Sequence, residues 1–271
     1  MEYPINENRL PVDQFEKLGL YDQGTIYLDR MNLDALRAGR RTEMINMANL
    51  RLDGLSIRQL DAKLSLSEGN DGQIKLNIHP VYRRPVDHPL LSRQEMDLLI
   101  GGKETSIEKN APLSTKRQKS VVIEYDEQTR EFVAYYPSQV QPPTEINGET
   151  LSNKQKDDFR HGKIVELSDG TLLQHSATDS RGIRSSSARL VATLPVDGIA
   201  EKVVFRNISN IKGNNSPQQQ GFSKGYNRAL TEMLTSEMTV TEGELSVQEY
   251  SRQQQQYANL KGQDGRQQPR R

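Results

Sequence analysis

The sequence contains no cysteine, and aromatic residues make up only 6% of its 271 residues. The absence of cysteine excludes disulfide bonds, thiolate metal sites and a cysteine nucleophile, and it is consistent with a reducing compartment. No stretch approaches the roughly 20 apolar residues that a membrane helix needs. The first residues, MEYPINENRLPVDQFEKL, also lack the apolar core of a signal peptide. We therefore expect a cytoplasmic protein with no membrane partner.

Net charge and apolar content are low as well. The 36 Lys and Arg residues balance the 36 Asp and Glu residues, which argues against a dominant nucleic-acid-binding surface but leaves room for a local basic patch. Hydrophobic residues make up 34% of the chain, and the mean hydropathy is −0.78. Because this composition is polar for a globular chain, we expect small cores and a part of the chain that does not pack.

Three stretches repeat one helical pattern: LDRMNLDALRAGR (28–40), LSRQEMDLLIGGK (91–103) and LSNKQKDDFRHGK (151–163). Each has an N-cap residue after a leucine, a large apolar residue seven positions later, and then a glycine followed by a cation. Glycine is the residue that best ends a helix in the left-handed conformation. Each copy therefore predicts a helix of two to three turns, with caps at Asp29, Ser92 and Ser152 and closing glycines at Gly39, Gly102 and Gly162.

Side-chain pairs at the expected helix starts match the capping box, in which two side chains satisfy backbone donors reciprocally. These pairs are Asp13 with Glu16, Ser92 with Glu95, and Ser152 with Gln155. The sequence Gly-Gly-Lys at 101–103 closes a helix, whereas a phosphate-binding P-loop opens one. Asp97 and Glu104 also stand where that motif needs glycine and Ser or Thr, so the P-loop interpretation is rejected.

A predicted β-hairpin follows each helix, in KLSLSEGNDGQIKLNIHPV, SVVIEYDEQTREFVAYYP and SARLVATLPVDGIAEKVVFRNI. The predicted fold class is α+β, with three related helix-plus-hairpin units in tandem, then a C-terminal helix and a disordered Gln-rich tail. The predicted boundaries are 1–86 for the N-terminal segment and first unit, 87–143 for the second unit, 144–212 for the third unit, and 213–271 for the linker, helix and tail. Units this small bury little surface alone, so we expect them to pack on one another.

The candidate chemistry is sparse. The histidines, at positions 79, 88, 161 and 175, show no metal-binding spacing. Asp157 and Asp158 are adjacent on a helix and diverge, and no G-x-S-x-G elbow is present. We therefore expect no metal, no cofactor and no enzymatic activity.

Two basic stretches, 109–120 and 179–189, are predicted to be loops between helix and hairpin. Their cations and serines are of the kind that contacts phosphate groups, while the absence of aromatic residues within them argues against base stacking. Ordinary solvated loops are the alternative. The candidate nucleic-acid-binding residues are Lys116, Arg117, Lys119, Arg181, Arg184 and Arg189.

The segments LPVDQFEKLGL, LDALRAGRRT, AKLSLSEGNDGQIKLNIHPVYRRP and HPLLSRQEMDLLIGGK resemble a bacterial N-terminal domain of unknown function. The segment EINGETLSNKQKDDFRHGKIVEL is similar to a second uncharacterised domain that often follows the first. The resemblance covers about residues 8–195, and the third unit departs from the usual pattern after Leu167. It implies a protein of conjugative or other mobile elements, and it assigns no catalytic residue.

The leading hypothesis is a non-catalytic accessory or adaptor protein that presents hairpin edges and loops to an unidentified protein partner. The alternatives are direct DNA binding through the two basic stretches and the basic tail, and an enzyme of unrecognised type. DNA binding predicts basic residues gathered on one face, an adaptor predicts an exposed apolar patch, and an enzyme predicts a deep pocket with perturbed pKa values. The sequence leaves the oligomeric state and the packing of the units open.

Overall fold

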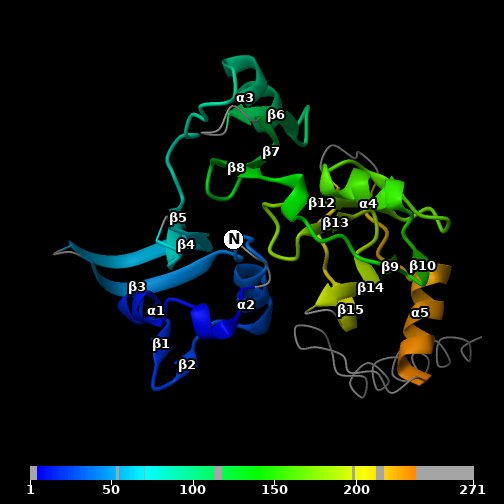
Figure 1. Ribbon diagram of the computed structural model, residues 1–271, viewed down its shortest axis with the longest axis horizontal. Helices are drawn as coiled ribbons and strands as arrows, with labels where there is room; N and C mark the ends of the chain where they lie inside the picture. The colour runs from blue at the N-terminus through cyan, green and yellow to red at the C-terminus, as the bar shows by residue number, and fades with distance from the viewer. Residues whose placement is uncertain are drawn as a thin grey trace, which may run out of the picture.

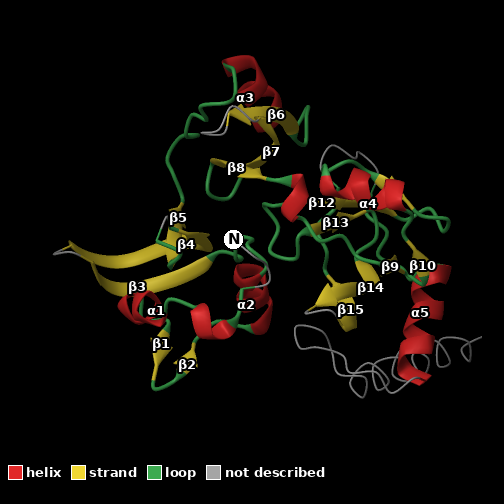
Figure 2. Ribbon diagram, in the orientation of Figure 1, coloured by secondary structure: helices red, strands yellow, loops and turns green. Residues whose placement is uncertain are grey.

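The computed structural model describes residues 5–52, 55–69, 71–112, 118–196, 199–211 and 217–235. Within them the fold is α+β, as predicted, with short helices and small antiparallel sheets (Figures 1 and 2). The predicted tail lies outside the described residues. None of the described helices has the length and apolar character needed to cross a membrane.

The first unit packs two short helices against a three-stranded sheet. Its core is formed by Phe15, Leu36, Met47 and Leu64, which are nearly inaccessible to solvent. In chain order its elements are the 3-10 helix η1 (Glu7–Arg9), α1 (Val12–Lys17), β1 (Tyr21–Asp22), β2 (Thr25–Ile26), α2 (Arg30–Arg37), β3 (Ile45–Leu52), β4 (Leu55–Glu68) and β5 (Ile74–Pro80). The strand order β3-β4-β5 leaves β3 and β5 as the edges of this sheet.

The second unit repeats the plan of one helix on a three-stranded sheet. Leu99 of its helix packs against Ile123 and Phe132 of the sheet. Its elements are α3 (Arg93–Ile100), β6 (Ile107–Pro112), β7 (Gln118–Asp126), β8 (Glu131–Tyr135) and the 3-10 helix η2 (Pro137–Gln139). The strand order is β6-β7-β8.

The third unit has two sheets rather than the single hairpin that was expected. Its elements are β9 (Glu145–Ile146), β10 (Glu149–Thr150), α4 (Asn153–Arg160), β11 (Val165–Glu166), β12 (Leu172–His175), β13 (Ile183–Ser185), β14 (Arg189–Val196) and β15 (Ile199–Arg206). The predicted hairpin forms as β14–β15, but it belongs to the sheet β10-β9-β14-β15. The counterpart of the sheets in the other units is β11-β12-β13, whose strands are too short to show clear alternation.

A C-terminal helix, α5 (Lys224–Thr235), covers the β14–β15 hairpin. Tyr226, Leu230 and Met233 are buried against Val191 and Val204, so the predicted C-terminal helix is confirmed and packs on the third unit. Phe222 precedes this helix, and its ring stacks on that of Tyr226 at 5.4 Å.

The predicted caps of the three repeated helices are confirmed. Asp29, Ser92 and Ser152 accept hydrogen bonds from backbone N–H groups three residues later, and the capping boxes at Ser92 and Ser152 are complete. The closing glycines, Gly39, Gly102 and Gly162, have φ of 71°, 65° and 67°. The capping box predicted at Asp13 is wrong, because α1 starts directly after Pro11 and Asp13 lies in its first turn. There its charge favours the positive helix end without capping it.

Gly162 closes its helix against the second unit, which makes it a test of how the units pack. A Cβ at Gly162 would lie 2.7 Å from the hydroxyl of Tyr135, whereas a Cβ at Gly102 would meet nothing within 4 Å. Gly102→Ala is expected to cost about 1 kcal/mol for the left-handed backbone alone. Gly162→Ala is expected to cost clearly more, measured as the free energy of unfolding in urea. Equal losses would show that this contact between units contributes nothing.

Candidate functional site

The loop between β12 and β13, residues 176–182, is inserted between the first and second units. The carbonyl of Thr178 accepts a hydrogen bond from Lys63 Nζ at 3.0 Å, and the carbonyl of Ser180 accepts one from Arg40 Nε at 2.9 Å. On its other side, the hydroxyl of Ser176 donates to Glu124 at 2.8 Å. The loop therefore contacts both other units.

Glu124 holds this loop from the second unit. Its carboxylate accepts the hydroxyl of Ser176 and the backbone N–H groups of Ala177 and Thr178, at 2.8, 3.1 and 3.3 Å. Burial raises the pKa of Glu124, although these hydrogen bonds oppose the shift.

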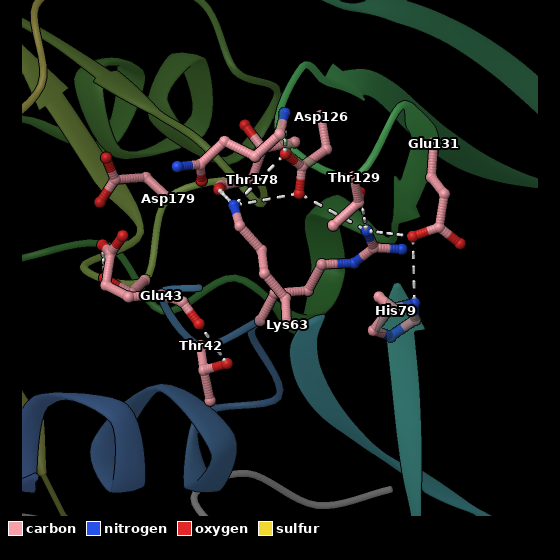
Figure 3. Close-up of polar contacts among 12 residues, drawn as sticks. Thr42, Glu43, Lys63, His79, Asp126, Thr129, Glu131, Thr178 and Asp179 are labelled. Atoms are coloured by element: carbon pink, nitrogen blue, oxygen red, sulfur yellow. Dashed lines mark hydrogen bonds and ion pairs between the residues drawn. The ribbon is translucent and has the colours of Figure 1, made fainter. Parts of the chain in front are cut away.

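A group of ion pairs joins the first and second units (Figure 3). Lys63 Nζ lies 3.0 Å from Asp126 Oδ2, and both side chains are almost inaccessible, at 3% and 2% exposure. Arg41 Nη1 lies 2.8 Å from Glu131 Oε2 and 3.5 Å from Asp126 Oδ2. The three units therefore close a triangle, in which each contacts both others.

A cavity of about 590 Å³ lies where the three units meet; we call it the central cavity. Its volume falls in the usual range for ligand sites, about 300–1,000 Å³. It is lined by α2, β4 and β5 of the first unit, β8 of the second, and β14 and β15 of the third.

Two sheet edges open onto the central cavity. Residues 132–136, on and just after β8, all line it, as do residues 203–206 of β15. Because successive side chains of a strand point to opposite faces, an unbroken run of lining residues places the cavity along the strand edge. Both strands are the last in their sheets among the described strands.

The charged lining of the central cavity is mostly basic. Asp34 and Glu201 are its acidic lining residues, against Arg30, Arg37, Arg40, Arg41, Arg181 and Arg206. Most of these arginines have acidic neighbours, such as Glu201 for Arg30 at 3.9 Å and Glu43 for Arg181 at 3.8 Å. The guanidinium of Arg40 donates through Nε to the carbonyl of Ser180.

Three residues that line the cavity, Arg40, His175 and Tyr135, have shifted pKa values. Burial lowers the pKa of Arg40 to about 10 and that of His175 to about 3. Burial also raises the pKa of Tyr135, whose hydroxyl has no hydrogen-bond partner among the described residues. The rings of Tyr135 and His175 meet edge to face, with centroids 4.8 Å apart.

The predicted nucleic-acid-binding residues that the structure describes contact different parts of the protein. Lys116 and Arg117 lie outside the described residues. Lys119 lies over the ring of Tyr136, at 4.2 Å, and Arg181 lines the central cavity. Of the remaining two, Arg184 donates to Ser176 and to the carbonyl of Asn210 in its own unit, and Arg189 donates to the carbonyl of Gln220 in the segment before α5.

The two stretches that carry these residues are not the loops that were predicted. Residues 109–120 span parts of β6 and β7, and 179–189 contains β13. Four polar side chains of the second stretch are buried, namely Asp179, Ser180, Ser185 and Ser187. The reason is that their hydroxyl and carboxylate groups find partners inside the fold, which the polar composition alone does not reveal.

The charged residues of the unit junction that the sequence did not single out lie in ordinary strand positions. Lys63 and His79 belong to the polar faces of β4 and β5, and their acidic partners, Asp126 and Glu131, come from the second unit. The large exposed apolar residues are spread over several segments: Tyr27, Val81, Tyr82, Val86, Ile100, Ile164 and Phe222. In the described part of the chain, no three His, Asp or Glu side chains are grouped so that they could hold a metal ion.

Residues 5–90 match the family model described as "Protein of unknown function (DUF4099)". This segment is therefore similar to an uncharacterised domain, and it contains the first unit and the joint that follows it. Neither the curated proteins nor the solved structures contain a match to the chain.

Proposed function

We propose that the chain is an accessory protein of a bacterial mobile element and acts as an adaptor. In this proposal the central cavity captures an extended segment of a partner protein, which adds as a strand to the free edge of β15. The mobile-element setting rests on the resemblance of the two uncharacterised segments. The capture mode rests on one observation, the unbroken run of residues 203–206 along the cavity.

The register of the sheet shows which backbone groups the edge offers. The N–H of Asn147 on the β9 side donates to the carbonyl of Val191, so Val191 of β14 faces β9. Its neighbours along β14 must then face β15, where Ala192 pairs with Val203. By the same alternation, the N–H and C=O of Val204 point away from β14 and toward an added strand.

A proline at position 204 should therefore block strand addition without breaking the β14–β15 ladder, since proline is tolerated at edges. Peptides selected from a displayed random library on the full chain are expected to lose binding at least about tenfold on Val204→Pro, because an edge hydrogen bond is lost. Val204→Ala, which removes side-chain packing but keeps the N–H, is the matched control and is expected to retain them. Peptides that bind both variants equally would contradict edge capture.

DNA binding is tested in the same preparation, with fluorescent duplex and single-stranded DNA at roughly 50 and 200 mM salt. Binding that collapses with salt would support the nucleic-acid alternative instead. Two of the candidate cations do not favour it, because Arg184 and Arg189 already donate to partners within the chain, Ser176 and Gln220.

A further inference from the structure

Three side chains beside the central cavity connect a hydroxyl to a carboxylate. Ser65 Oγ on β4 lies 2.8 Å from His79 Nε2 on β5. His79 Nδ1 lies 3.3 Å from Glu131 Oε2 on β8, as the dashed line in Figure 3 shows. A hydroxyl, an imidazole and a carboxylate in this order are the arrangement that activates a serine nucleophile.

The carboxylate fixes the direction of proton transfer. Burial alone would raise the pKa of Glu131, but the hydrogen bond from His79 and the charge of Arg41 outweigh burial and lower it. Glu131 is therefore ionised and favours the His79 tautomer with its proton on Nδ1. Nε2 is then the acceptor, and the hydroxyl of Ser65 donates to it.

The hydroxyl and the imidazole of this group can be reached by a substrate in the central cavity. Ser65 and His79 line the central cavity, as do Ser67 and Asn77. Asn77 lies directly opposite Ser65 in the β4–β5 register. Its Oδ1 accepts the hydroxyl of Ser67 at 3.4 Å, so its amide N–H₂ is left to donate to an oxyanion formed beside Ser65.

We propose that Ser65 and His79 are the nucleophile and base of a serine hydrolase site, oriented by Glu131, whose substrate is an ester of an anionic acid. Ser65 Oγ attacks the carbonyl carbon while its proton passes to His79 Nε2. The ester C–O bond then breaks, the alcohol leaves with that proton, and the acid stays as an ester of Ser65. Water, deprotonated by His79, releases the acid and restores the hydroxyl.

The preference for an anionic acid comes from the cavity lining. Arg37, Arg40 and Arg181 line the same cavity as Ser65, and arginine is the usual partner of carboxylates. The activity goes beyond the adaptor function and replaces the expectation of a non-catalytic chain. Motif reasoning missed the site because Ser65 lies within a strand, outside any G-x-S-x-G elbow.

The first test is labelling of the full chain with a rhodamine-tagged fluorophosphonate, followed by peptide mass mapping. Attack by Ser65 Oγ on phosphorus expels fluoride, so the adduct should map to Ser65. Ser65→Ala should abolish labelling, and His79→Gln should slow it by about 100-fold or more. Ser56→Ala, at an exposed position of β4 that does not line the central cavity, is the matched control and should label normally. Absence of an adduct on Ser65 in the folded wild-type chain would overturn the proposal.

The role of Glu131 as a positioning residue needs a separate readout. In the wild type, ¹⁵N NMR should show the His79 proton on Nδ1, without any variant. In Glu131→Gln the labelling rate should fall, and the ¹⁵N spectrum should show a larger share of the tautomer with the proton on Nε2, because the ionised acceptor of the Nδ1 proton is gone. An unchanged tautomer and an unchanged labelling rate would assign Glu131 a structural role only and would overturn the triad.

Substrate charge is tested with two aryl esters, 4-nitrophenyl acetate and the 4-nitrophenyl monoester of succinic acid. The wild type should hydrolyse the succinate ester faster, and Arg40→Gln should remove most of that preference, measured as the ratio of the two rates. Equal rates for both esters in the wild type would overturn the anionic preference. The peptide-binding test at Val204 does not depend on Ser65, so the two proposals fail separately.

Discussion

Replacing Asp126 by asparagine is expected to lower the free energy of unfolding by about 3–5 kcal/mol, the usual cost of removing one partner of a buried ion pair. The introduced asparagine would keep the shape of the side chain but not its charge. Lys63 would keep two neutral oxygen acceptors, the carbonyl of Thr178 at 3.0 Å and the amide oxygen at position 126, but no ionised partner. Arg41 would still have Glu131 at 2.8 Å, so most of the loss comes from Lys63.

The loss should depend on Lys63, and this dependence separates an uncompensated charge from a simple packing defect. Lys63→Met removes the stranded ammonium, so the double variant should be more stable than Asp126→Asn alone. Asp61→Asn, at an exposed position of the same strand β4, is the matched control and should change little, because the asparagine Oδ1 can still accept the hydrogen bond from Asn46. Urea unfolding of the four variants measures the coupling. A double variant that is less stable than Asp126→Asn would contradict this account.

The helix caps could be predicted because their causes are local. Ser92 and Glu95 are three residues apart, and their reciprocal hydrogen bonds form in any chain that starts a helix there. At the other end of α3, Gly102 closes the helix in the left-handed conformation, which is also a local effect. Such features depend on a few neighbouring residues, so a single sequence contains the necessary information.

The junction of the units could not be predicted in this way. Alternation along β4 correctly places Leu64 in the core and Lys63 on the opposite, polar face. A polar face is normally solvated, yet here it meets Asp126, which lies 63 residues away in the sequence. Whether such a face is solvated or paired depends on how the units pack.

Burial of polar residues in the third unit could not be predicted from the sequence either. Residues 179–189 have the composition of a solvated basic loop, but Ser185 and Ser187 are fully buried. The hydroxyl of Ser187 is satisfied by the carbonyl of Arg189 at 3.0 Å. Small polar residues pack inside a fold whenever such partners exist, so their hydrophilicity is a poor guide to exposure.

Acid is expected to destabilise the protein through His175 well before its carboxylates are protonated. Burial, with the nearby charge of Arg40, lowers the pKa of His175 to about 3, whereas a histidine of the unfolded chain has a pKa of about 6.5. Below pH 6.5 His175 therefore binds a proton in the unfolded state but not in the folded state. The stabilising contribution is complete above about pH 6.5 and is lost as the pH falls, by about 1.4 kcal/mol per pH unit.

The His175→Asn variant isolates this effect, because an asparagine amide can replace the Nδ1–H that donates to the carbonyl of Gly182 at 2.8 Å and does not titrate. Its free energy of unfolding in urea should fall less steeply between about pH 6.5 and 5 than that of the wild type, and the difference in slope should approach one proton. Burial also lowers the pKa of His88, but that contribution is common to both proteins and cancels. Parallel curves, or a His175 imidazole that titrates by NMR in this range, would mean that the ring is solvated. Water would then reach His175 at the junction of the three units.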